Sequence, residues 1–138
     1  MTNHLQFQIS AGELSSFDTT GTQSIIGPAY AGAPGFVNDP TTTSIPKKGA
    51  LPQGWYEIGS PVDDPVTGLY TLPLTPLAAG NAYGLPATET FDRSEFKIHG
   101  PNAAKDIDGA QESSEGCIVA VHPERVVAAT FTLIEVVS

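Results

Sequence analysis

Short alternating apolar runs, broken by glycine and proline, are the feature that most limits how this chain can fold. Leu5, Phe7 and Ile9 alternate with polar neighbours, which is the period of two expected of a half-buried β-strand. No stretch carries a long apolar stripe with the 3.6-residue period of an amphipathic helix. The 14 glycines and 12 prolines also exceed ordinary usage, so many turns are expected. The pattern predicts a mostly β fold with long loops and one or two short helices.

The expected elements begin and end where this alternation starts and stops. We predict strands at residues 5–9, 13–20, 22–30, 55–58, 70–74, 96–99, 117–121 and 130–137. Residues 31–52 form a long loop, and loops of that length in compact domains are usually functional or mobile. Pro123 suits the first helical position, so a short helix is expected to run through Ala128. We expect a turn at residues 63–65 and a polar, turn-rich segment at residues 101–116.

Chain length and charge narrow the class of protein. The 138 residues carry no internal repeat or linker, so we expect a single domain over residues 1–138. Six basic against fifteen acidic residues give a net charge of −9, which argues against nucleic acid and anionic membrane surfaces as partners. Neither a charged leader with an apolar stretch nor a run of about 20 apolar residues is present. We therefore expect synthesis in the cytoplasm without a signal peptide, and no membrane span.

Cysteine and histidine content limits metal and redox chemistry. The single cysteine excludes an intrachain disulfide framework and a cysteine-based zinc cluster. The three histidines are dispersed without the spacing of a metal motif, so no metal and no cofactor is expected. His4, near the terminus, is expected to be solvated, and His122 is expected to be a helix-start residue.

The segment from residue 96 to residue 119 is the one that could carry catalysis. His99 ends a predicted strand on the face opposite Phe96 and Ile98, and Cys117 follows eighteen residues later in a Ser-Glu-Gly-Cys turn. A nucleophilic thiol needs a base, and an imidazole partner lowers the pKa of the thiol and later protonates a leaving amine. Gly116 allows a tight backbone approach that aims N–H groups at a developing oxyanion. From these residues alone, a cysteine before four apolar residues is more often core packing.

Three ordered motifs resemble a known enzyme family. They are Gly54-Trp55-Tyr56-x-Ile58-Gly59, Phe96-x-Ile98-His99-Gly100 and Ser114-Glu115-Gly116-Cys117-Ile118-Val119. Together they resemble the L,D-transpeptidase (YkuD-type) catalytic domain, and more closely its small Tlde-type branch of toxins delivered by type VI secretion systems. Glu115 stands where the broader family usually has a second histidine, and Val119 where it often has Arg or Asn. The resemblance implies an L,D-transpeptidase-like β-sandwich.

The resemblance also implies acyl transfer on peptidoglycan stem peptides. Cys117 would attack the amide between the L-centre of meso-diaminopimelate and the terminal D-alanine of a tetrapeptide stem. His99, oriented by a backbone carbonyl, would act as base and acid; Gly116 would help to hold the oxyanion, and Ser114 would support the turn. The expected substrate contacts are Gly100, Glu115, Trp55 and Tyr56. Water, a free D-amino acid or the amine of another stem would then resolve the thioester.

Delivery by a type VI system to the periplasm of a target cell implies two protein partners. One is a periplasmic immunity protein that blocks the cleft, and the other is a carrier protein of the secretion machine. Two alternatives stay open from the sequence. The chain could be a phage or housekeeping wall-editing enzyme of the same chemistry, or a catalytically silent wall-binding module.

Overall fold

The computed structural model describes residues 3–101 and 114–138, so most of the polar segment predicted at residues 101–116 lies outside the described residues. The strands, in chain order, are β1 (His4–Gln8), β2 (Glu13–Phe17), β3 (Gln23–Pro28), β4 (Tyr30–Ala31), β5 (Gly54–Ile58), β6 (Val62–Asp64), β7 (Gly68–Pro76), β8 (Phe96–His99), β9 (Ile118–Val119) and β10 (Leu133–Val137). One 3-10 helix, η1 (Pro40–Thr42), and one α-helix, α1 (His122–Ala128), complete the described elements. The mostly β prediction is confirmed.

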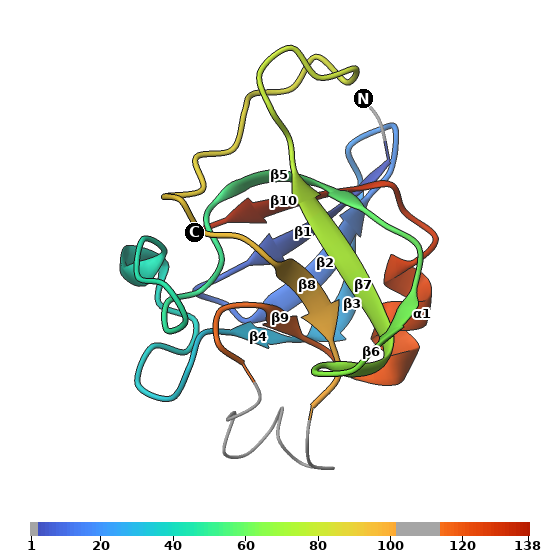
Figure 1. Ribbon diagram of the computed structural model, residues 1–138. Coiled ribbons are helices and arrows are strands. Elements are labelled where there is room, and N and C mark those ends of the chain that lie inside the picture. The colour runs from blue at the N-terminus through green and yellow to red at the C-terminus, as the bar shows by residue number, and fades with distance from the viewer. Residues whose placement is uncertain (1–2, 102–113) are drawn as a thin grey trace.

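The strands join into one hydrogen-bonded path, in the order β3-β2-β1-β10-β5-β7-β8-β9-β4, with β6 paired to β7. Two neighbouring pairs are parallel, β1 with β10 and β8 with β9, and the other pairs are antiparallel. Figure 1 shows this path curving, so that β1 and β2 lie behind β7 and β8. The two layers of the predicted sandwich therefore belong to one continuous sheet.

The core fills the space between these two layers. Leu5 and Phe7 of β1 belong to the same buried cluster as Leu72 of β7 and Ile98 of β8. Helix α1 contacts β7 and β3 and adds Ala128 to the cluster, which closes one side of the curved sheet. Because successive strand residues point to opposite faces, the residues between these core positions are turned away from the core.

Several element boundaries differ from the sequence prediction. The strand predicted at residues 22–30 is divided into β3 and β4, because β3 pairs with β2 whereas β4 pairs with β9. The strand predicted at residues 117–121 is reduced to Ile118–Val119, since a tight turn precedes it and α1 follows it. Residues 62–64 form β6, which the alternation pattern did not predict, although Asp64 does accept the turn hydrogen bonds expected of it. The predicted helix through Ala128 is confirmed as α1.

Candidate active site

Parallel pairing of β8 with β9 brings His99 and Cys117 to one face of the sheet. Ile98 lies beside Ile118, and His99 lies beside Val119. Because Ile98 and Ile118 point into the core, Lys97, His99 and Cys117 lie on the opposite face. There they line a cavity of about 490 Å³ with residues of the 46–47, 66–67, 92–96 and 114–116 segments. The imidazole and the lone thiol thus line one open cavity, while their hydrogen bonds go to Gly100 and Glu95.

The imidazole of His99 is held by its own neighbour in the chain. Its Nδ1 lies 2.9 Å from the carbonyl oxygen of Gly100, and a carbonyl only accepts, so Nδ1 carries the proton and Nε2 is the free base. The side chain is 5% exposed. Burial lowers the pKa of His99, and the positive charges of Arg125 and Lys97 lower it further, while the hydrogen bond to Gly100 opposes them. The imidazole is consequently neutral at neutral pH, as a general base must be.

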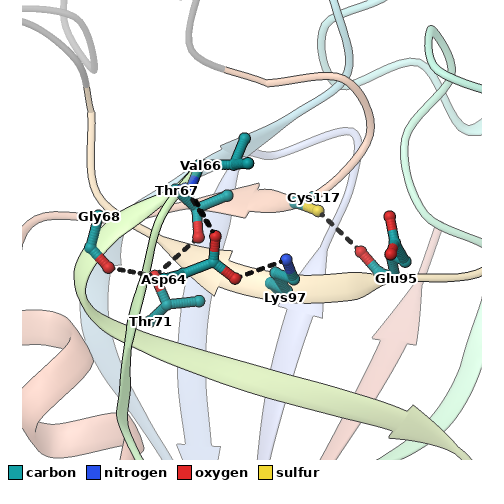
Figure 2. A network of polar contacts seen from close by, with 8 residues as sticks. All are labelled: Asp64, Val66, Thr67, Gly68, Thr71, Glu95, Lys97 and Cys117. Carbon is teal, nitrogen blue, oxygen red and sulfur yellow. Dashed lines mark hydrogen bonds and ion pairs between the residues drawn. The ribbon is translucent and has the colours of Figure 1, made fainter.

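The thiol of Cys117 is protonated in this arrangement. It donates to the carbonyl oxygen of Glu95 at 3.4 Å, and that hydrogen bond, rather than one to His99, holds the side chain (Figure 2). Burial raises the pKa of the Cys117 thiol, while the main chain and ammonium of Lys97 and the guanidinium of Arg93 oppose the shift. The expectation of an imidazole-lowered thiol pKa is therefore wrong for the resting protein, because desolvation outweighs the nearby positive charges.

Ser114 shapes the turn that presents the thiol. Its buried Oγ accepts hydrogen bonds from the N–H groups of Gly32 at 3.1 Å and Gly116 at 2.9 Å, and donates to the carbonyl of Cys117 at 2.7 Å. These contacts are those of a positioning residue, in agreement with its expected support of the turn. They also occupy the N–H of Gly116. The predicted role of that N–H in an oxyanion hole is thus not supported, which leaves the N–H of Cys117 as the candidate donor.

Gly116 is required for a different reason. Its backbone has φ +128°, a region that favours glycine, and a Cβ there would lie 2.8 Å from the carbonyl oxygen of Gly49 and still closer to the guanidinium of Arg93. Arg93 donates to the carbonyl oxygens of Thr43, Ala50 and Gly49 at 2.7, 2.8 and 2.9 Å. These hydrogen bonds hold residues 43–50 of the long loop against the turn that precedes Cys117.

The remaining predicted contact residues are divided between several environments. Glu115 is exposed and lines the Cys117 cavity, as a substrate contact must. Gly100 does not line it; its carbonyl orients His99, and a Cβ there would lie 2.6 Å from the guanidinium of Arg125. Tyr56 has no exposed surface and donates to the carbonyl of Pro52 at 2.6 Å, and Trp55 lines a different cavity. Trp55 and Tyr56 are therefore not placed to contact a substrate at Cys117.

Sequence reasoning missed an ion pair at the edge of the site. The ammonium of Lys97 lies 2.8 Å from Asp64 Oδ2, while Asp64 Oδ1 accepts from the N–H groups of Val66 and Thr67 at 2.8 and 3.0 Å (Figure 2). Val66 and Thr67 line the cavity, so the pair holds the β6–β7 hairpin against it. The available signal was the position of Lys97, two residues before His99 and thus on the same strand face.

Residues 3–101 and 114–138 hold neither a cluster of metal ligands nor a membrane-spanning helix. No group of three or more His, Cys, Asp or Glu side chains in these ranges could hold a metal ion. No helix among the same residues is both long and apolar enough to cross a membrane.

Comparison with known proteins shows the family and the fold. Residues 26–136 match the Tlde1 domain. Bd1075 of Bdellovibrio bacteriovorus is similar in structure, at 15% identity and a TM-score of 0.54, over 96% of this chain and 46% of that one. So is the L,D-transpeptidase (Yku) of Stackebrandtia nassauensis, at 9% identity and a TM-score of 0.54, over 99% of this chain and 55% of that one.

The chain thus spans about half the length of these two solved structures, and the likeness to them is one of fold. No curated protein matches it. The family match covers most of the chain and includes all three motifs on which the resemblance was based. The chain has the fold of an L,D-transpeptidase and, by this match, belongs to the Tlde1 domain family.

Proposed function

We propose that this protein is a cysteine-dependent peptidoglycan-editing enzyme, an L,D-carboxypeptidase and L,D-transpeptidase that removes or exchanges the terminal D-alanine of tetrapeptide stems. The observation that carries the proposal is the pairing of β8 with β9, which sets His99 and Cys117 on one face of one cavity. The family match supports the substrate class. A cysteine that only packs in the core does not require an open cavity or an oriented imidazole beside it.

The reaction starts from a neutral pair. The thiol turns from Glu95 toward the cavity, and Nε2 of His99 takes its proton as the sulfur attacks the carbonyl carbon of the scissile amide. The carbonyl π electrons move to oxygen, and the N–H of Cys117 donates to this oxyanion. Collapse of the tetrahedral intermediate expels the amine of D-alanine, which receives the proton from the imidazolium, and leaves a thioester on Cys117.

The second half of the reaction regenerates the thiol. His99, neutral again, takes a proton from water or from the amine of an incoming D-amino acid as that group attacks the thioester. The sulfur leaves and takes the proton from His99, so atoms and charge balance over the cycle. Water yields the carboxypeptidase product, a free D-amino acid yields the exchange product, and the amine of another stem yields a cross-link.

Nearby charges favour the anionic sulfur that forms during attack. Lys97 and Arg93 are the positive groups that lower the pKa of Cys117 against the effect of burial. In the desolvated cavity such charges act more strongly than they would in water. Arg93 donates to three main-chain carbonyls and Lys97 is paired with Asp64, so both positive charges are held in place beside the site.

We further propose that the protein is an antibacterial type VI secretion effector that acts in the periplasm of the target cell. Its partners would then be a periplasmic immunity protein and a carrier protein of the secretion machine. The match to the Tlde1 domain supports this biological role. A phage or housekeeping enzyme of the same chemistry, or a silent wall-binding module, is the alternative that the experiments below would reveal.

Mass spectrometry of muropeptides tests the chemistry directly. Tetrapeptide muropeptides are incubated with the protein, with and without D-methionine, alongside Cys117→Ala and His99→Ala variants and a Ser60→Ala control at an exposed position. We expect tripeptides without D-methionine, a D-methionine-exchanged tetrapeptide with it, and neither product from the two site variants. Equal product from wild type and Cys117→Ala would refute the enzyme. Lysis on periplasmic expression, lost in Cys117→Ala, tests the toxin role.

A further inference from the structure

A second cavity lies on the outer face of the sheet and is separate from the catalytic one. It measures about 700 Å³, and its lining includes His4, Gln6, Phe17, Trp55, Tyr83 and Glu135. None of its lining residues also lines the cavity of Cys117. Its volume is within the range of ordinary small-molecule sites. It contains the one tryptophan of the chain, and the proposed reaction makes no use of that residue.

Strand register places an aromatic, an acidic and an amide side chain in one row. Glu135 of β10 pairs with Trp55 of β5 on one side and with Gln6 of β1 on the other. Ile134 and Tyr56, their neighbours along the strands, belong to the core cluster, so all three members of the row face outward. The row therefore places an indole, a carboxylate and an amide side by side on adjacent strands.

A second row beside it is aromatic. His4 pairs with Phe17, and their rings stack with centroids 5.3 Å apart and an interplanar angle of 10°. The ring of His4 also meets Trp55 edge to face at 4.9 Å. His4 is 8% exposed, so the expectation that it is solvated is wrong: the two aromatic rings enclose it. These contacts hold Trp55 in one orientation before any ligand arrives.

The rim of this cavity is also built in advance. Asn81 donates to the carbonyl oxygens of Ala78 and Leu85 at 2.9 and 2.7 Å and accepts from the N–H of Tyr83 at 3.1 Å. Tyr83 donates its hydroxyl proton to the carboxylate of Glu57. A rim loop with this many internal hydrogen bonds is preorganised, which reduces the entropy cost of binding.

The chemistry of the lining disfavours an anion and suits a ligand with one apolar face and polar edges. Among the described residues no Lys or Arg lines the cavity, and Glu135 disfavours an anion. The flat rings of Trp55 and Tyr83 match the C–H face of a sugar ring. The amide of Gln6 and the carboxylate of Glu135 match hydroxyl and acetamido groups at its edge.

We propose that this cavity binds the neutral N-acetylhexosamine glycan of the cell wall and so holds the enzyme on the polymer whose stem peptides it edits. The proposal rests on the proposed function for the choice of polymer, but the cavity and its chemistry are independent of Cys117. Binding of a sugar here requires no substrate at the catalytic cavity, so the two activities can be measured separately.

Fluorescence of Trp55 tests the proposal, since no other tryptophan contributes to the signal. The full protein is titrated with tetra-N-acetylchitotetraose, and we expect a saturable change in emission. Tyr83→Ala should weaken binding about tenfold, because it removes one stacking ring, whereas Tyr83→Phe keeps the ring and should bind within about twofold of wild type. Ile25→Ala, which removes an exposed apolar side chain of β3 outside both cavities, should bind normally.

Activity assays separate this proposal from the proposed function. Tyr83→Ala should release D-alanine from a soluble tetrapeptide at the wild-type rate but more slowly from intact sacculi. No saturable response to the sugar, or an equal response in Tyr83→Ala, would overturn the glycan site even if D-alanine is released. A response to lysine amide in place of the sugar would instead identify a site for cations. Sugar binding without D-alanine release would leave the glycan site standing and refute the enzyme.

Discussion

Replacing Ser114 by alanine measures how far one hydroxyl organises the catalytic turn. The hydroxyl satisfies two buried N–H groups, those of Gly32 and Gly116, and itself donates to the carbonyl of Cys117. Each buried donor left without an acceptor costs about 1–3 kcal/mol, so the two donors together predict that Ser114→Ala lowers the free energy of unfolding by about 2–6 kcal/mol. With a urea slope of about 2 kcal/mol per molar, the unfolding midpoint should fall by about 1–3 M.

The assay is urea unfolding followed by the emission of Trp55, with D-alanine release measured on the same preparations. Ser60→Ala makes the same chemical change at an exposed serine and should leave the midpoint unchanged. Ser114→Thr keeps the hydroxyl and should recover much of the lost stability. Equal midpoints for Ser114→Ala and Ser60→Ala would refute the reasoning. Full stability combined with lost activity would instead assign the hydroxyl a chemical role.

Three further predictions concern charge. Because burial lowers the pKa of His99 and raises that of Cys117, kcat/KM should rise with pH through a value below 6.5 and fall only above about 9. For the same reason, alkylation of Cys117 by iodoacetamide should be slow at pH 6, and rapid alkylation at that pH would indicate a preformed ion pair. Lys97→Met should raise the pKa of the Cys117 thiol further and lower kcat/KM about tenfold, and Lys97→Arg should recover part of this loss. Unchanged kinetics in Lys97→Met would exclude the ammonium from catalysis. Burial raises the pKa of Glu124 to about 7, above its unfolded value, so folding stability should increase as pH falls from about 7 to about 4.5. Glu124→Gln should remove this pH dependence and stabilise the protein at pH 8 by up to about 3 kcal/mol, as measured by urea unfolding at each pH.

The expected pH dependence of His99 has the opposite sign to that of Glu124. His99 is held neutral in the folded state, so below pH 6.5 the unfolded chain binds more protons and stability falls as pH decreases. The two effects oppose each other in the wild-type protein just below pH 6.5. The difference between wild type and Glu124→Gln isolates the carboxyl, and a difference that does not vary with pH would contradict its raised pKa.

The local sequence pattern was sufficient to predict the elements that carry the site residues. Alternation over residues 96–99 predicted that His99 faces away from Phe96 and Ile98, and strand β8 has this arrangement. Pro123 predicted the start of α1. These predictions are reliable because strand alternation and proline geometry depend on residues only a few positions apart.

The neighbours of the site could not be predicted in the same way. Asp64 meets Lys97, and Arg93 meets Thr43, Gly49 and Ala50, across 33 to 50 positions of sequence. Such contacts depend on which strands pair and on how the sheet curves. Neither is encoded in a local period of apolar residues.

The sequence by itself determined the chemical inventory: one thiol, an imidazole at a strand end and a glycine before the cysteine, on a chain whose alternation demands a sheet. Only the tertiary structure decided how these groups are used. In the folded protein the N–H of Gly116 donates to Ser114, Tyr56 is buried, and Trp55 lines a second cavity. The physical reason is that hydrogen-bond partners, burial and therefore pKa shifts are set by long-range packing, which brings distant residues together and excludes water from some of them.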